Sequence, residues 1–302
     1  MAGKPPISDA AQQLLNQLQR NRISLPERDD LAHYRRDTRA RFLPWIERAR
    51  KAFDGEIKDI EIAGVACRQL TPHDWQQQGG TCIQYAFGGG FFSGGVDEDL
   101  VIAAPLAQLS HCRLIMVDYR LSPEHPYPQP QEDMRQVYPV LLDVFGAEHL
   151  AVCGESAGGN QVLSLLQHAR NNGQLMPACA ALLSPWCDLA DPLADDEGQD
   201  PTLDRSWART AADWHADGQA LTDPGISPLY GDMTGLPPTL ITSGSRDLLL
   251  AMSRRLADKM QSAGVDCELR EHEGMWHVFE YYPIPEAEQS LRDIAAYLEA
   301  RT

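Results

Sequence analysis

The feature that most constrains this chain is the stretch 154–159 (GESAGG), which lies between a short apolar run and a helical pattern. The run 150–153 is typical of a buried strand, and the residues from 157 onward have helical spacing. A serine on a sharp strand-to-helix turn needs small neighbours, because its backbone is strained and other chain passes close by. The bare G-x-S-x-G string also occurs by chance, but in this context it predicts that Ser156 is a nucleophile exposed above a sheet, at the N-terminus of a helix.

The pattern around this stretch predicts an α/β fold. Runs rich in β-forming residues occur at 57–62, 65–70, 81–87, 114–119, 150–153, 178–183, 239–243 and 267–271. From the third run onward, most are separated by helix-like stretches, including 99–109, 157–171 and 248–263. Alternation of this kind predicts a mainly parallel sheet with helices on both faces.

Two segments do not follow this alternation. Residues 9–53 have helical character and are divided by Pro26 and Pro44. Residues 185–238 surround a helical stretch, 203–216, and are too long for a simple connection. We therefore divide the chain into N-terminal cap helices (1–53) and a catalytic domain (54–302) with a cap insertion at about 186–236. The alternative is that both segments only extend the core.

Two further residues are predicted to act with the serine. A serine hydroxyl is a weak nucleophile, so it needs a base, and the base needs an orienting carboxylate. In one large class of serine hydrolases on mainly parallel sheets, in which the serine lies on a strand-to-helix turn, the order along the chain is nucleophile, acid and histidine. Asp247 follows the run 239–243, and His277 lies between the last strand and the final helix. Since the carboxyl ends of parallel strands meet at one edge, we predict that Ser156, Asp247 and His277 form a catalytic triad.

Other acids and histidines fit this order less well. His272 lies in or at the end of the last strand, where a surface histidine is the simpler interpretation. Asp188 and Asp191 follow a strand, but one strand too early for the orienting acid. His125 precedes the serine in a proline-rich loop, so we interpret it as structural.

A glycine loop at 87–92 (FGGGFF) directly follows the strand predicted at 81–86. Consecutive glycines let backbone N–H groups point at a substrate oxygen without an intervening side chain. Two such donors, together with the amide of Ala157, would hold the oxyanion of a tetrahedral intermediate. The alternative is a flexible glycine turn, which the position after a strand and before the nucleophile disfavours.

The composition excludes several kinds of partner. Lys and Arg number 26 against 43 Asp and Glu, which gives a formal charge of −17 and disfavours nucleic acid and anionic lipid surfaces. Six arginines in one early segment predict a solvated helix face: Arg35, Arg36, Arg39, Arg41, Arg48 and Arg50.

The seven cysteines predict reduced thiols. They are widely spaced, lie mostly in apolar runs and form no C-x-x-C pair, so neither a disulfide framework nor a zinc site is expected. The first ten residues have no apolar signal-peptide core, and no apolar stretch has the length of a membrane span. We therefore expect a cytoplasmic protein.

Taken together, these motifs resemble the hormone-sensitive-lipase-like family of esterases, a branch of the α/β-hydrolases. Besides the elbow, the segment 117–128 (VDYRLSPEHPYP) is similar to the family's segment between the oxyanion loop and the nucleophile. The resemblance covers roughly residue 84 to the C-terminus. It implies an eight-stranded sheet with a helical cap, no cofactor, hydrolysis of short or medium acyl esters, and an oxyanion hole formed by the amides of Gly89, Gly90 and Ala157.

Two departures from the family pattern concern the site. Phe87 stands where the family usually has a histidine, which removes a side chain that could hold the glycine loop by hydrogen bonding. Asp247 is followed by apolar residues at 248–252, where the family usually carries further acids. Neither change removes a reacting group, but both bear on the range of substrates.

The sequence therefore predicts a serine carboxylester hydrolase that works through an acyl-enzyme. Trp207 and Trp214, spaced for one helix face, either line its substrate pocket or belong to the core. We expect a small-molecule ester as substrate and no metal, and we leave a homodimer open. The alternatives are a small-molecule binding protein on the same scaffold, or a serine hydrolase of amides, lactones or a specialised natural ester.

Overall fold

The computed structural model describes residues 7–20, 30–75, 80–191, 193 and 200–302. All eight predicted runs are strands: β1 (Gly55–Ile62), β2 (Val65–Pro72), β3 (Cys82–Ala86), β4 (Arg113–Val117), β5 (Leu150–Glu155), β6 (Cys179–Leu183), β7 (Thr239–Gly244) and β8 (Cys267–His272). They form one sheet in the order β1-β2-β4-β3-β5-β6-β7-β8. The predicted mainly parallel, eight-stranded α/β sheet is confirmed.

The sheet departs from parallel pairing only at its first strands. β1 and β2 form an antiparallel hairpin, and β2 pairs antiparallel with β4. The hairpin turn consists of Ala63 and Gly64, both with positive φ (51° and 81°), as two-residue turns that match the twist of the strands require. Because β3 to β8 are parallel, the loops after β3, β5, β7 and β8 leave the sheet at the same edge.

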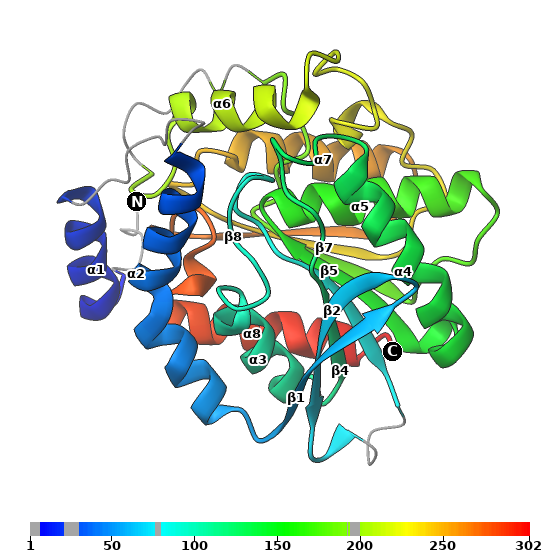
Figure 1. Cartoon of the computed structure of the whole chain (residues 1–302), viewed down its shortest axis with the longest axis horizontal. Coiled ribbons are helices and arrows are strands. Elements are labelled where there is room, and N and C mark those ends of the chain that lie inside the picture. The colour runs from blue at the N-terminus through cyan, green and yellow to red at the C-terminus, as the bar shows by residue number, and fades with distance from the viewer. Residues whose placement is uncertain (1–6, 21–29, 76–79, 192, 194–199) are drawn as a thin grey trace, which may run out of the picture.

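Helices cover both faces of the sheet (Figure 1). On one face α3 (Leu100–Leu109) packs against α8 (Pro285–Glu299), and on the other α4 (Gln129–Phe145) packs against α5 (Ala157–Asn171). α7 (Leu250–Ser262) lies beside β7 and β8. The sequence analysis did not anticipate α4, because Pro130 and Pro139 disguise it; a proline in the first turn costs a helix little.

Three more helices lie beyond the sheet edge that bears the loops: α1 (Asp9–Arg20), α2 (Leu31–Ala52) and α6 (Arg205–Ala216). In Figure 1, α1 and α2 form one flank of the molecule and α6 runs along its top. The prediction that Pro44 divides the early helices was wrong, since α2 continues through it. Pro44 is exposed, so water can solvate the carbonyl group that its ring deprives of a partner. Pro26 lies outside the described residues.

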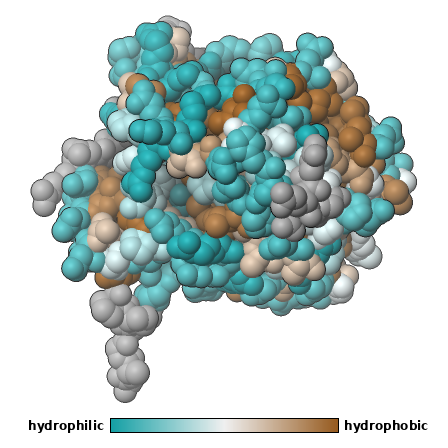
Figure 2. All heavy atoms as spheres, turned by 90° about the horizontal axis from the view of Figure 1, so that it is seen from below, coloured by the Kyte–Doolittle hydropathy of each residue, from teal (hydrophilic) through white to brown (hydrophobic). Residues whose placement is uncertain are grey.

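The core follows the central strands. Every residue of β3, β5 and β6 is buried. All seven cysteines are buried and free, as predicted. Hydrophilic side chains cover most of the face shown in Figure 2, with hydrophobic side chains in separate patches. Among the helices of the described residues, none combines the length and apolarity needed to cross a bilayer.

Candidate active site

Ser156 occupies a strained turn between β5 and α5. Its φ and ψ are 51° and −117°, an unfavourable conformation for a residue with a side chain. Two backbone hydrogen bonds fix it, from the Ser156 amide to the Leu183 carbonyl (2.8 Å) and from the Trp186 amide to the Ser156 carbonyl (2.9 Å). A Cβ on Gly158 would lie only 2.0 Å from the carbonyl oxygen of Ala86, so the motif's glycine is required here by close backbone packing.

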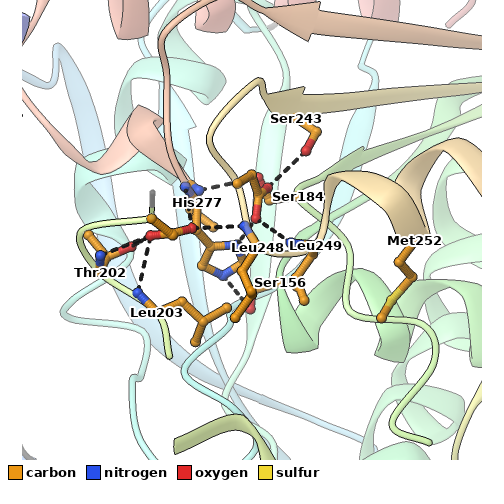
Figure 3. A network of polar contacts seen from close by, with 12 residues as sticks. Ser156, Ser184, Thr202, Leu203, Ser243, Leu248, Leu249, Met252 and His277 are labelled. Carbon is orange, nitrogen blue, oxygen red and sulfur yellow. Dashed lines mark hydrogen bonds and ion pairs between the residues drawn. The ribbon is translucent and has the colours of Figure 1, made fainter. Parts of the chain in front are cut away.

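The structure brings the three predicted triad side chains together. His277 Nε2 lies 3.0 Å from Ser156 Oγ, and His277 Nδ1 lies 3.0 Å from Asp247 Oδ1 (Figure 3). Asp247 is itself fixed, because its Oδ2 accepts a hydrogen bond from Ser243 Oγ (2.9 Å) and its Oδ1 accepts one from the Leu249 amide (2.9 Å). With Nδ1–H donating to the carboxylate, Nε2 is left as the acceptor of the serine proton.

The charges at this site favour an ion pair between His277 and Asp247. Burial alone would lower the pKa of His277, but Asp247 and further acids nearby raise it to about 9. Burial alone would raise the pKa of Asp247, but His277 and several hydrogen bonds hold it below its usual value. An imidazolium that forms during proton transfer is therefore stabilised in place.

Within the described part of the chain, three backbone amides of the predicted oxyanion hole have no acceptor. Those of Gly89, Gly90 and Ala157 donate no hydrogen bond to any residue that the structure describes. Gly89 and Gly90 have φ values of 93° and 62°, which glycine adopts without strain. Backbone amides are rarely left unpaired, so three free donors among the described residues, two on the glycine loop and one directly after Ser156, match the requirements of an oxyanion hole.

Packing holds the glycine loop in place of the histidine found in the family. The ring of Phe87 stacks on Tyr119, with centroids 4.2 Å apart and an interplanar angle of 9°. The Tyr119 hydroxyl donates to the carbonyl of Phe87 at 2.5 Å. On the other side of the loop, Phe91 stacks on the buried His215 of α6 at 3.9 Å. With Phe87 at this position the loop lacks a polar side chain, but ring stacking and the Tyr119 hydrogen bond still hold it in place.

Arg35 also supports this loop, so the predicted solvated arginine face was wrong in part. Its Nε donates to the carbonyl of Phe92 (2.7 Å), and one Nη donates to the carbonyl of Ser122 (2.9 Å). Both Nη atoms contact the carboxylate of Glu124 (2.7 and 2.8 Å). Charge clustering along a helix does not reveal which arginine will meet backbone carbonyls from a distant loop.

A cavity of about 290 Å³ opens onto Ser156 and His277. Its wall includes residues of α1, α2 and α6, among them Leu18, Tyr34 and Trp207. The Trp207 ring covers Gly90, whose added Cβ would lie 2.3 Å from it, and Trp207 Nε1 donates to the Tyr34 hydroxyl (3.0 Å).

Trp214 does not line this cavity and packs edge-on against Phe92, with ring centroids 5.1 Å apart. The pairing of Trp214 with Trp207 as pocket residues therefore needs correction. A spacing of seven residues places Trp207 and Trp214 on the same face of the helix, but about 10 Å apart along the helix axis.

The acids and histidines that the sequence analysis considered as alternatives for the triad contact other residues. Asp188 and Asp191 both pair with Arg255 of α7. His125 is exposed and contacts Gln129 (2.9 Å), and His272 packs against the ring of Phe279. Among the described residues, no group of three or more His, Cys, Asp or Glu side chains is placed to hold a metal ion.

A buried carboxyl pair lies beside the nucleophile and was missed by the sequence analysis. The Tyr281 hydroxyl contacts both Asp99 and Glu155, the latter at 3.1 Å, and Tyr85 donates to Asp99 (2.7 Å). One hydroxyl proton cannot serve both acids, so one carboxyl group must carry a proton when both contacts are hydrogen bonds. Accordingly, burial raises the pKa of Glu155 to about 7 and that of Asp99 well above its usual range.

Asp200 was missed as well. It is buried, and it accepts hydrogen bonds from the amides of Leu248 and His277. The sequence gives no signal for these two contacts, because Leu248 and His277 lie 48 and 77 positions away along the chain.

The fold and this arrangement define a class. A serine on a strand-to-helix turn, followed along the chain by an acid and a histidine at the same sheet edge, is the arrangement of a serine hydrolase on an α/β-hydrolase fold. The family model described as "alpha/beta hydrolase fold" matches residues 83–281.

Comparison with known proteins narrows the class. The chain is 32% identical over 249 residues to an esterase of Acinetobacter venetianus, covering 80% of this chain and 81% of that protein. It is 30% identical over 233 residues to the carboxylesterase NlhH of Mycobacterium tuberculosis, covering 72% and 73%. A crystal structure of an esterase from the bacterial hormone-sensitive lipase family superposes with a TM-score of 0.86 at 27% identity, covering 100% of this chain and 99% of the other. The chain belongs to the hormone-sensitive-lipase-like family of serine esterases within the α/β-hydrolases.

Proposed function

We propose that Ser156, His277 and Asp247 carry out carboxylester hydrolysis through an acyl-enzyme. The observation that supports this most strongly is the continuous pair of 3.0 Å contacts from Ser156 Oγ through the imidazole to Asp247. His277 takes the hydroxyl proton as Ser156 attacks the ester carbonyl and returns a proton to the departing alcohol. Water, activated by the same imidazole, then releases the acid.

In the same proposal, the amides of Gly89, Gly90 and Ala157 hold the oxyanion. The absence of an acceptor among the described residues and the places of these amides, two on the glycine loop and one directly after Ser156, support this role. Each donor is expected to contribute about 10²- to 10³-fold in rate.

We propose short to medium acyl esters as substrates, with Trp207 as a wall of the pocket. A cavity of about 290 Å³ is at the small end of ligand sites, which supports small esters over long-chain lipids. Residues 1–53 and about 186–236 would form a cap over the catalytic domain 54–302, because side chains of α1, α2 and α6 line the cavity. The cytoplasmic location and the homodimer stay predictions; light scattering on the purified protein tests the second.

Two variants and one matched control test the triad. Wild-type protein should react with a fluorophosphonate probe and hydrolyse p-nitrophenyl acetate and butyrate. Ser156→Ala and His277→Ala should lose roughly 10⁴-fold or more in kcat. His125→Ala, which replaces an exposed histidine that does not line the cavity, should keep full activity. Turnover retained by either triad variant in its folded state would rule the assignment out, and wild-type protein that neither labels nor turns over would favour a binding protein.

A further inference from the structure

Asp200 lies directly before residues 201–204, which line the cavity. Its side chain is almost fully buried, with 2% exposed. Its Oδ1 accepts hydrogen bonds from the Thr202 amide (2.9 Å), the Thr202 hydroxyl (2.8 Å) and the Leu203 amide (3.1 Å). One oxygen of Asp200 therefore fixes the part of the wall that faces the substrate.

The other oxygen reaches the triad loops. Oδ2 accepts hydrogen bonds from the Leu248 amide (3.0 Å) and the His277 amide (3.2 Å). Figure 3 shows Thr202 and Leu203 on one side of this network and Leu248 and His277 on the other. Leu248 directly follows the triad acid, so a single carboxyl group is bonded to both loops that carry the partners of Ser156.

Burial and the charge of Asp247 raise the pKa of Asp200, but His277 and the backbone donors oppose this, and the contacts are of the kind that an ionised carboxylate makes. All five are donors to Asp200, and charge-assisted hydrogen bonds of this type are stronger and shorter than neutral ones. A neutral amide at the same position has only one oxygen, so at least two of the five donors would face an N–H₂ group.

We propose that Asp200 is a positioning residue for the triad, which ties the loops of Asp247 and His277 to the cavity wall and adds a negative charge beside the imidazole. The proposal rests on the function proposed above. It makes the geometry of the acid and the base depend on the wall that holds the substrate.

The charges around the imidazole make this testable by pH. The acids with the largest effect on the His277 imidazole are Asp247 from the loop after β7, Asp200, and Glu155 from the end of β5, and the charge of Asp200 also acts on Tyr282. Burial lowers the pKa of His277, and these three acids raise it. Removing the charge of Asp200 should therefore move the pKa of His277 toward acid, which a purely structural role would not do.

The test compares wild-type protein with Asp200→Asn. On p-nitrophenyl butyrate, kcat should fall by about 10-fold or more, because the two triad loops lose a shared acceptor. The midpoint of the rising limb of kcat/KM against pH should move toward acid by on the order of one unit. An unchanged midpoint, or full kcat in the folded variant, would overturn the proposal. If Asp200→Asn does not fold, Asp200→Ser provides the same two readouts.

Asp188→Asn is the matched control. Like Asp200, Asp188 is a buried acid (1% exposed) between β6 and β7, but it pairs with Arg255 and is not among the groups with the largest effect on the pKa of His277. Removing the charge of Asp188 should lower the free energy of unfolding and leave the midpoint of the kcat/KM profile against pH unchanged.

A second measurement separates this proposal from the proposed function. If the wild-type protein hydrolyses no ester, that function fails, and the imidazole of His277 can still be titrated by NMR in wild-type protein and in Asp200→Asn. Equal titration midpoints would then overturn the role of Asp200 independently of any activity.

Discussion

Replacing Gly158 by alanine is expected to force the nucleophile apart from the oxyanion loop. Gly158 lies in the first turn of α5, which passes close to the end of β3. A Cβ at this position would lie 2.0 Å from the Ala86 carbonyl oxygen and 2.6 Å from that of Phe87. Cβ atoms essentially never lie within 3.0 Å of another heavy atom, so the two segments must separate by at least 1.0 Å, the difference between 3.0 and 2.0 Å. Because both obstacles are backbone atoms, no side-chain rotation relieves the contact.

The size of the effect follows from what lies on each side of the contact. One side carries Ser156 and the amide of Ala157, and the other leads into the amides of Gly89 and Gly90. A displacement of about 1 Å in an active site can cost roughly 10²-fold in rate, equivalent to about 2.7 kcal/mol. Overpacking of this kind also lowers the free energy of unfolding by about 1–3 kcal/mol.

The assay is kcat/KM on p-nitrophenyl butyrate, measured where circular dichroism shows each protein to be folded. Gly173→Ala is the control, since Gly173 follows the other end of α5, has a φ of 69° and has no atom within 4 Å of an added Cβ. Its strain should cost about 1–3 kcal/mol of stability without loss of rate in the folded protein. A folded Gly158→Ala protein with wild-type kcat/KM would refute the argument from close packing.

Four other predictions concern the base (two of them), the pocket and the loop. Since the pKa of His277 is raised to about 9, kcat/KM should rise with pH through about 9 as the imidazole becomes neutral, and a flat profile from about pH 7 to 10 would contradict this. Because the pKa of His277 is higher in the folded protein than its ordinary value of 6.5, protonated His277 also stabilises the fold. This contribution to the free energy of unfolding is fully present below pH 6.5 and is lost as the pH rises through about 9, which urea unfolding at several pH values would show. Trp207→Ala removes a pocket wall and the hydrogen bond to Tyr34, so the ratio of kcat/KM for p-nitrophenyl octanoate over butyrate should rise by about 10-fold; an unchanged ratio would place that wall elsewhere. Tyr119→Phe leaves the buried carbonyl of Phe87 without its donor, so the free energy of unfolding should fall by about 1–3 kcal/mol in urea titrations, and no fall would mean that another donor replaces it.

Several features of this protein could be predicted from short windows of sequence. The strands follow from runs of β-forming residues, and the elbow follows from glycines beside Ser156. Asp247 and His277 were identified because they follow two strands in a fixed order, and the topology then places them at one edge of the sheet. The signals for the strands and the elbow are local, since backbone preference and hydrophobic spacing act over a few residues, whereas those for Asp247 and His277 also needed the order of the strands along the chain.

Other features were decided only by tertiary contacts. Asp200 meets partners 48 and 77 positions away, Phe87 is held by Tyr119, and Arg35 reaches the carbonyl of Phe92. The sequence left open whether Trp214 lines the pocket or belongs to the core, because helical spacing gives the face of a residue but not what lies opposite it. The chain itself determined which segments become strands and which residues can react. The buried groups that position those residues were decided by contacts between loops that lie far apart along the chain. A hydrogen bond requires two atoms within about 3 Å, and a single sequence does not specify that distance for residues far apart along it.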